Sequence, residues 1–366
     1  MMARFTATYR VRSDATSIEA RARAIATEQS VEMPLEAISE PGILSDIVGR
    51  VETITPCSGD LFEVRIALAT ETVGHDAGQL LNMAFGNTSL HHDVALHDLD
   101  LPPEMAAEFG GPRHGIAGLR ARAGACERAL TCSALKPIGL SPNRLANLAR
   151  QFALGGIDFV KDDHGMADQT AAPFAARVPA CAAAIRRAAA ETGHPTRYVP
   201  SLSGDLGAMR ERIAVARNEG LDTFLIAPLL AGFANAQSLM RENPDMAFIA
   251  HPTMGGAAGI DPSLLIGRLF PLIGADAVIF PNHGGRFGYS PTTCAAIAAT
   301  ARAPGPTLRG ALPVPAGGMT LQRVPEMLDF YGKDAMLLIG GNLLAAGDQL
   351  TRQTAQFARA VAHHRY

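Results

Sequence analysis

The sequence lacks the features that would place it in a specialised class of protein. No apolar run reaches the roughly 18 residues that a membrane-spanning helix needs. The N-terminal residues also lack the apolar core of a signal peptide. The net charge is only −3, so composition gives no reason to expect a nucleic acid or a membrane surface as a partner. We therefore expect a cytoplasmic globular protein.

Cysteine is also scarce. The chain has five cysteines, an odd number, and none of them forms a CxxC motif. This pattern argues against a disulfide framework and against a zinc site. We expect these thiols to be buried in a protein from a reducing compartment.

The most informative shortage is that of lysine. Of the 32 lysines and arginines, only Lys136, Lys161 and Lys333 are lysines. A guanidinium group stays protonated, whereas a lysine amine can lose its proton, form an imine or take up CO2 as a carbamate. A lysine that is retained in such a chain therefore suggests chemistry that arginine cannot perform.

The first hundred residues show the order of elements of a ferredoxin-like fold. Alternating apolar and polar residues predict half-buried strands, and apolar stripes at helical spacing predict helices. The predicted strands are 4–11, 50–55, 61–68 and 93–99, and the predicted helices are 14–28 and 76–84. This β-α-β-β-α-β order is the split βαβ arrangement. Prolines and glycines then mark a boundary, so we expect a small α+β domain over residues 1–112.

From about residue 128 the pattern changes to short apolar runs separated by amphipathic helices. The predicted strands are 130–136, 159–163, 197–201, 223–227, 247–251, 277–282, 312–316 and 336–339. Eight β-α repeats over about 220 residues predict a (β/α)8 TIM barrel, which we place at residues 113–366. Catalytic residues of such barrels lie at the C-terminal ends of the strands.

The second predicted strand of the barrel ends in a run of ionisable residues that suits a metal site. Lys161 as a carbamate, Asp163 and His164 would supply two oxygen ligands and one nitrogen ligand. Oxygen ligands favour Mg2+, and an imidazole also admits Mn2+ or Fe2+. Alternation along the strand places Lys161 and Asp163 on one face, toward the barrel mouth. A simple ion pair between them at the rim is the alternative.

Three further strand ends carry candidates for proton transfer. Lys136 ends the first strand and is a candidate general base, because nearby cations or a metal would lower its pKa. The alternative for Lys136 is a clamp on a phosphate or carboxylate. His251 and His283 end the fifth and sixth strands and could bind substrate oxygens or carry a proton.

The last two strands end in glycine pairs, Gly317-Gly318 and Gly340-Gly341. In barrels, the loops after these strands often bind phosphate through backbone N–H groups. Two pairs at the two expected places predict a phosphate site, although glycines in tight turns would give the same pattern. Arg286 is a further candidate contact for phosphate, or equally an exposed loop arginine.

The run from Gly155 to His164 resembles the Gly-Gly-x-Asp-Phe-x-Lys-x-Asp-Glu signature of the RuBisCO large-chain superfamily. The resemblance covers nearly the whole chain, including the order of the two domains. Further matches are Gly86-Asn87, Gly111-Pro112-Arg113-His114-Gly115, Lys136-Pro137, Gly139-Leu140-Ser141, Ala316-Gly317-Gly318 and Gly340-Gly341.

The resemblance implies roles for individual residues. It makes Lys136 the catalytic lysine, Lys161 the carbamylated lysine and Asp163 a metal ligand. It also implies a homodimer with a shared active site, in which Glu28 and Asn87 reach the active site of the neighbouring subunit.

The sequence also departs from the carboxylases of this superfamily. His164 stands where the third metal ligand is normally Glu, and Ile138 stands where a second lysine follows the first strand. Pro252 follows His251 in place of the arginine for a second phosphate. No lysine lies between residues 162 and 332, so the loop after the sixth strand lacks the lysine that handles CO2. The chain therefore resembles the RuBisCO-like proteins (form IV), which do not fix CO2.

The remaining groups suit proton abstraction next to a carbonyl, with a metal stabilising the enediolate. By resemblance we expect a 5-methylthioribulose-1-phosphate isomerase of methylthioadenosine and methionine salvage, acting on a phosphorylated sugar. The alternatives are a 2,3-diketo-5-methylthiopentyl-1-phosphate enolase and a decarboxylase of the 3-oxo-isoapionate-4-phosphate type. A regulatory or binding protein with a decayed site is the alternative that is not an enzyme.

Overall fold

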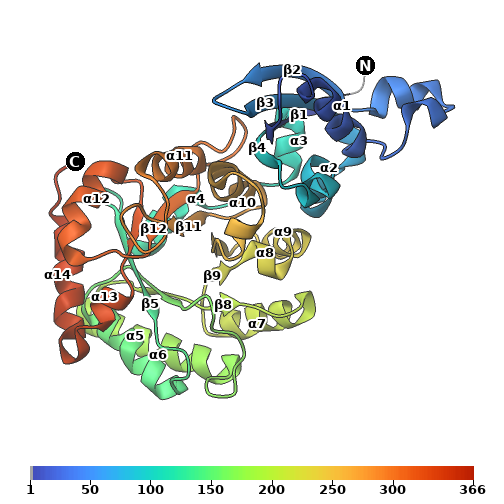
Figure 1. The fold of residues 1–366 in the computed structure, drawn as a ribbon. Coiled ribbons are helices and arrows are strands. Elements are labelled where there is room, and N and C mark those ends of the chain that lie inside the picture. Colours follow the sequence, from blue (N-terminus) through green and yellow to red (C-terminus); the bar gives the residue numbers. More distant parts are fainter. Residues whose placement is uncertain (1–2) are drawn as a thin grey trace.

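The computed structural model describes residues 3–366, so the first two residues of the predicted N-terminal domain lie outside the described range. The chain forms an N-terminal α+β unit beside a barrel of parallel strands surrounded by helices (Figure 1). The predicted fold class is confirmed by this arrangement. No helix within the described range is both long and apolar enough to span a bilayer.

The N-terminal unit is a four-stranded antiparallel sheet with the order β2-β3-β1-β4. Its elements are β1 (Arg4–Arg12), α1 (Ile18–Glu28), β2 (Arg50–Pro56), β3 (Leu61–Ala69), α2 (Ala77–Phe85) and β4 (Val94–Asp100). Alternation explains the central strand, because Phe5, Ala7, Tyr9 and Val11 are all buried in the core. The predicted order of strands and helices is therefore confirmed.

Two details of this unit differ from the prediction. Helix α1 begins at Ile18 and not at Asp14, because the Asp14 carboxylate accepts hydrogen bonds from the backbone N–H groups of Thr16 and Ser17 and holds a turn there. The segment between α1 and β2, for which the sequence pattern predicts no strand or helix, contains short helical turns, η1 (Leu35–Ala37) and η2 (Ile43–Ile47).

All eight predicted strands of the barrel are present. They are β5 (Leu130–Leu135), β6 (Phe159–Asp162), β7 (Arg197–Val199) continuing into β8 (Ser201–Leu202), β9 (Thr223–Ile226), β10 (Ala247–Ala250), β11 (Ala277–Pro281), β12 (Leu312–Ala316) and β13 (Met336–Leu338). They form two parallel sheets, β13-β5-β6-β7 and β12-β11-β10-β9-β8. Contacts of β12 with β13 and of β7 with β9 close these sheets into a barrel.

Helices cover the outside of the barrel (Figure 1). They are α5 (Pro142–Leu154), α6 (Phe174–Thr192), α7 (Leu206–Asn218), α8 (Pro228–Ala231), α9 (Phe233–Glu242), η6 (Ser263–Leu269), α10 (Phe270–Leu272), α11 (Pro291–Arg302), α12 (Val324–Tyr331), α13 (Gly341–Leu344) and α14 (Leu350–Ala362). Helix α4 (Gly115–Ala123) differs, because its Leu119 and Ala123 pack in the cluster inside the barrel. A short helix, α3 (Pro103–Glu108), lies in the connection between the two units, where the prolines predicted only a boundary. Other single turns are η3 (Thr70–Thr72), η4 (Asn87–Leu90), η5 (Gly255–Ala257), η7 (Leu321–Arg323) and η8 (Gly347–Gln349).

Alternation along each strand divides the core into two layers. In β11, for example, Ala277 and Ile279 belong to the cluster inside the barrel, whereas Val278 and Phe280 pack in the layer under the helices. Strand β6 follows the same rule, because Phe159 lies in the inner cluster. The inward face of β6 therefore continues to Lys161, two residues further along the strand.

The cysteines are only partly as predicted. Cys132, Cys181 and Cys294 are buried free thiols. The expectation of burial is wrong for Cys57 and Cys126, which are exposed. Both lie in connecting segments outside the strands and helices, where the chain has no core to pack against.

A fully buried ion pair supports the end of β6 from the outside of the barrel. Asp162 points outward, and its Oδ2 atom accepts hydrogen bonds from Nη2 and Nε of Arg177 on α6, at 3.2 and 3.3 Å. The Tyr198 hydroxyl donates to Oδ1 at 2.7 Å. Arg177 Nη1 donates to the carbonyls of Ala167 and Ala172, so the same side chain also holds the loop after β6.

The loop that follows β10 is one of the segments that attach the N-terminal unit to the barrel, together with α9 and η6. The backbone N–H of Leu96 in β4 donates to the Gly259 carbonyl at 3.0 Å, and the N–H of Asp261 donates to the Leu96 carbonyl at 2.8 Å. The side chain of His97 also contacts the Asp261 carboxylate, at 3.2 Å. This loop therefore belongs to both units.

The buried pair predicts a large loss of stability when its cation is removed. Arg177→Met leaves the Asp162 carboxylate buried without its partner, which costs roughly 3–5 kcal/mol of the free energy of unfolding. Arg186→Met is a matched control on the same helix, because that side chain is 55% exposed in its pair with Glu219, and such pairs contribute about 1 kcal/mol or less. Urea titration measures both variants, and equal midpoints would contradict the role of Arg177.

Candidate active site

A cavity of about 860 Å³ opens at the C-terminal ends of the barrel strands. Its lining comes from segments that follow β5, β6, β10, β11, β12 and β13, so it gathers residues that are far apart in the sequence. Ten of the thirteen residues predicted from the sequence line it: Lys136, Lys161, Asp163, His164, His251, Arg286, Gly317, Gly318, Gly340 and Gly341.

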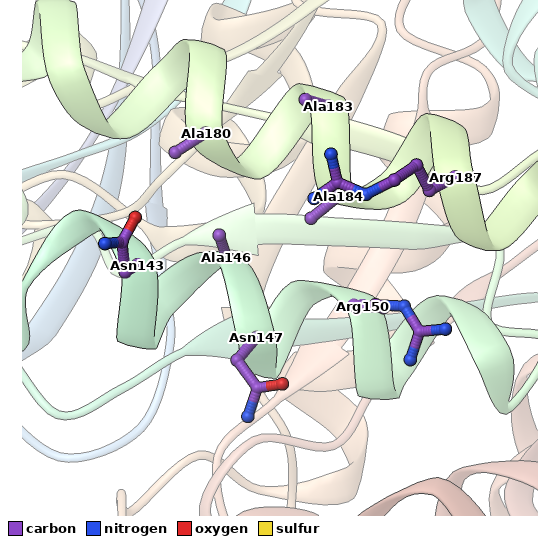
Figure 2. A pocket seen from close by; sticks show the side chains of 8 residues that line it. All are labelled: Asn143, Ala146, Asn147, Arg150, Ala180, Ala183, Ala184 and Arg187. Atoms are coloured by element: carbon purple, nitrogen blue, oxygen red, sulfur yellow. The ribbon is translucent and has the colours of Figure 1, made fainter.

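A second hollow lies on the outside of the barrel, between α5 and α6 (Figure 2). Its volume is about 300 Å³, and alanines, asparagines and two arginines line it. One of these arginines, Arg150, is paired with Glu191 at 2.8 Å. None of the candidate catalytic residues faces this hollow, so the cavity at the strand ends is the candidate active site.

Lys161 is held inside the barrel mouth with little access to solvent. Its side chain is 3% exposed, and Nζ donates to the Asp162 carbonyl at 2.9 Å. Burial lowers the pKa of Lys161 and outweighs the raising effects of Cys132 and Asp163, while the positive charge of Lys136 adds a smaller lowering effect. The site therefore favours the neutral amine, which is the form that reacts with CO2.

Asp163 is the shared acceptor of the site. Its Oδ2 atom accepts from Lys136 Nζ at 2.7 Å, and its Oδ1 atom lies 2.9 Å from His164 Nδ1. Burial alone would raise the pKa of Asp163, but the hydrogen bonds from His164 and Lys136 outweigh it and hold the pKa well below its usual range. Asp163 is therefore ionised at neutral pH.

The two imidazoles of the site are stacked. The rings of His164 and His251 have centroids 4.2 Å apart and an interplanar angle of 6°. His251 Nδ1 lies 2.6 Å from the Thr253 hydroxyl, which fixes the plane of the ring. Burial lowers the pKa of His251 to about 2, with further lowering by Lys161 and His164. His251 is therefore a neutral imidazole in this arrangement.

The residues at the end of β6 can bind a divalent cation only if Lys161 carries a carbamate. Among residues 3–366, no three His, Cys, Asp or Glu side chains are grouped so that they could hold a metal. Asp163 and His164 supply one carboxylate and one imidazole, and the amine of Lys161 becomes an oxygen ligand only as a carbamate. With that carbamate, the residues fit Mg2+ or Mn2+.

Both glycine pairs line the cavity. Gly317 and Gly318 have φ angles of +81° and +75°, which favour glycine. A Cβ atom on Gly318 would lie 2.5 Å from the Cα atom of Gly285, so the loop cannot accept a side chain there. Within the described chain, the N–H groups of both pairs donate to no other group. They are free to bind an anion such as a phosphate.

Of the other predicted residues, one lines the cavity and three do not. Arg286 lines the cavity, with its guanidinium 5.0 Å from the centre of the Phe287 ring. His283 does not line it, because its ring packs against Phe330 at a centroid distance of 4.7 Å. Glu28 and Asn87 lie on the N-terminal unit and bind each other, with Asn87 Nδ2 2.9 Å from Glu28 Oε1.

The structure adds lining residues that the sequence did not single out. Thr253 and Met254 follow His251 on the loop after β10, and Phe287 and Tyr289 follow Arg286 on the loop after β11. The signal that could have found them is their position, because residues just after a strand end face the barrel mouth. Their side chains are uncharged, so a pattern of ionisable residues at strand ends does not include them.

One family model and several known proteins match the chain. Residues 115–273 match the family model described as ribulose bisphosphate carboxylase large chain, catalytic domain. The 5-methylthioribulose-1-phosphate isomerase of Rhodospirillum rubrum is 59% identical over 363 residues, which are 99% of this chain and 97% of that protein.

Two further relatives extend the comparison. A 2,3-diketo-5-methylthiopentyl-1-phosphate enolase of Geobacillus thermodenitrificans is 34% identical over 76% of this chain and 70% of that protein. The crystal structure of a RuBisCO-like protein from Rhodopseudomonas palustris superimposes with a TM-score of 0.93 at 49% identity, over the full length of both chains.

The buried amine of Lys161 predicts carbamate formation that depends on pH. Only the neutral amine reacts with CO2, and burial lowers the pKa of Lys161, so the carbamate should build up as pH rises, below the range in which ordinary lysines lose their proton. Carbon-13 NMR with labelled bicarbonate measures this signal. Lys161→Gln should abolish it, whereas Lys333→Gln, which changes a half-exposed surface lysine, should leave it unchanged. A signal that survives Lys161→Gln would contradict the assignment.

Proposed function

Because the chain belongs to the RuBisCO large-chain family as a RuBisCO-like protein, we propose that it is an isomerase of 5-methylthioribulose 1-phosphate. The observation that carries this proposal is the identity of 59% with the Rhodospirillum rubrum isomerase, which extends over nearly the full length of both proteins. The cavity supports it, because the glycine pairs at one end suit one phosphate group. The reaction would proceed by removal of a proton next to the carbonyl of the ketose.

In this proposal Lys136 is the base. Its Nζ atom lies 2.7 Å from Asp163 Oδ2, so the amine becomes available only when this contact opens and the proton is lost. The neutral His251 ring, held by Thr253, would hydrogen-bond a substrate oxygen and carry a proton between substrate oxygens. The N–H groups of the glycine pairs would hold the phosphate, with Arg286 as a second contact.

Lys161 as a carbamate, Asp163 and His164 would hold Mg2+ or Mn2+, which supplies positive charge opposite the negative charge that develops on the substrate. The chain prepares for this by keeping Asp163 ionised and by favouring the neutral amine of Lys161. We assign no step to His283, because its ring lies outside the cavity lining.

The enolase reaction is the second candidate, because an enolase of this family shares 34% identity with the chain. It ranks below the isomerase because both the identity and the aligned share are smaller. A decarboxylase would need a cation for a substrate carboxylate, and Arg286 is the lining arginine that offers one.

We also propose a homodimer in which Glu28 and Asn87 complete the active site of the partner subunit. These residues are exposed or half-buried on the N-terminal unit and do not line the cavity of their own chain. Exposed apolar residues occur in the same part of the chain: Met33, Leu35, Ile43, Leu44 and Leu90. Such apolar surface is typical of a contact with another protein.

Sedimentation equilibrium should give twice the mass of the chain, and a monomer at micromolar concentration would contradict the dimer.

Proton exchange tests the reaction directly. In D2O with Mg2+ and CO2, the protein should introduce deuterium into 5-methylthioribulose 1-phosphate and convert it to a rearranged pentulose phosphate. Lys136→Met should slow both processes by about 10²–10⁴-fold, which is the usual contribution of a general base. Lys333→Met is the matched control and should retain the rate. Lys333 is half-exposed and precedes β13, so it lies at the opposite end of this strand from the cavity.

The alternatives are distinguished by parallel substrates. Enolisation of 2,3-diketo-5-methylthiopentyl 1-phosphate without exchange in the first substrate would favour the enolase. Release of CO2 from a 3-oxo sugar-acid phosphate would favour the decarboxylase. Unchanged turnover in Lys136→Met would show that another group is the base.

A further inference from the structure

One side of the active-site cavity is uncharged. The loop after β10 contributes Pro252, Thr253, Met254 and Gly256 to the lining. The nine residues 252–260 contain no charged side chain. Met254 is 56% exposed although it is apolar, and it lies beside the cavity that would receive the substrate. This part of the lining can contact an apolar group but offers no counter-ion.

The groups that bind anions lie elsewhere in the cavity. Three lining side chains are lysine or arginine. Lys136 follows β5, Lys161 lies on β6, and Arg286 follows β11. The glycine pairs follow β12 and β13, and β11 lies between β10 and β12. Two strand spacings of about 4.8 Å separate the loop after β10 from the first glycine pair by roughly 10 Å. Residues 252–256 therefore line an apolar side of the cavity that is separate from the glycine pairs.

The loop after β10 is held at both ends. At its start, the His251 N–H donates to the Ile226 carbonyl at 2.8 Å, and at its far end Leu96 of the N-terminal unit pairs with Gly259. Met254 has a backbone φ angle of +69°, which residues other than glycine rarely adopt. A strained residue persists only where its surroundings determine its conformation. Met254 is thus presented to the cavity in a defined position.

We propose that residues 252–256, with Met254 as the main contact, form the subsite that receives the uncharged alkylthio end of the substrate and excludes a second phosphate. This inference rests on the proposed function and names the part of the site that would distinguish its substrate. A flexible thioether side chain adapts well to a methylthio group. A phosphate at the same place would lose its hydration without gaining a cation from residues 252–256.

Binding of analogues that cannot react tests the subsite without turnover. The probes are ribitol 1-phosphate, its 5-methylthio derivative and ribitol 1,5-bisphosphate, measured by calorimetry. The 5-methylthio compound should bind about tenfold more tightly than ribitol 1-phosphate, because a buried methylthio group removes apolar surface from water. The bisphosphate should bind no more tightly than ribitol 1-phosphate.

Two substitutions of Met254 provide a matched pair. Met254→Lys keeps an unbranched side chain and adds a charge, so the advantage of the methylthio compound should fall to threefold or less and the bisphosphate should bind at least tenfold more tightly. Met254→Leu places another apolar side chain at the same φ angle and should keep the preference for the methylthio compound. Gly256→Arg repeats the charge test at a second position, where a Cβ atom would meet open space.

The outcomes separate the subsite from the reaction. If the wild-type chain turns over 5-methylthioribulose 1-phosphate but both charged variants keep its selectivity for the three probes, the subsite is wrong. If the selectivity changes as expected while the wild-type chain introduces no deuterium into that ketose, the subsite stands and the proposed function fails. Thermal unfolding of each variant shows whether the comparison is made on folded protein.

Discussion

The candidate active site depends on a buried ion pair that never faces the cavity. Asp162 and Arg177 are both inaccessible to solvent, and Arg177 also holds two carbonyls of the loop after β6. Because side chains alternate along a strand, fixing Asp162 outward fixes Lys161 and Asp163 inward. A buried charge is tolerated only with its partner, so this end of β6 has little freedom to twist or shift register. The positions of Lys161 and Asp163 follow from that constraint.

The barrel mouth holds two lysines but only one carboxylate contact for them, and this favours a neutral lysine amine. Lys136 and Lys161 both lie near a single ionised carboxylate, that of Asp163, and the contact at 2.7 Å goes to Lys136. The buried Lys161 is left without a carboxylate contact of its own, and burial favours its neutral form. An arginine could not respond in this way, because guanidinium keeps its proton. The scarcity of lysine in the whole chain fits a role that depends on losing a proton.

The strands were predictable from the sequence because each is a short apolar run with a fixed period, and their C-terminal ends located most of the cavity. Side-chain direction beyond the strand end was not predictable. His283 ends a strand as His251 does, yet its ring packs on Phe330. The contact between Asp162 and Arg177 was also hidden, because it joins a strand to a helix fifteen residues later through buried side chains. Such contacts depend on packing across elements, which periodicity does not describe.

The N-terminal unit contributes to the cavity even where it does not touch it. The loop after β10 begins at His251 in the barrel mouth and ends in backbone hydrogen bonds to Leu96 of β4. A loop held at one end only would let Met254 relax from its strained conformation. Because the loop is held at both ends, the position of the N-terminal sheet affects the position of this loop at the candidate active site. The apolar side of the cavity is therefore a product of both units, and a barrel without its N-terminal unit would lose the second anchor of this loop.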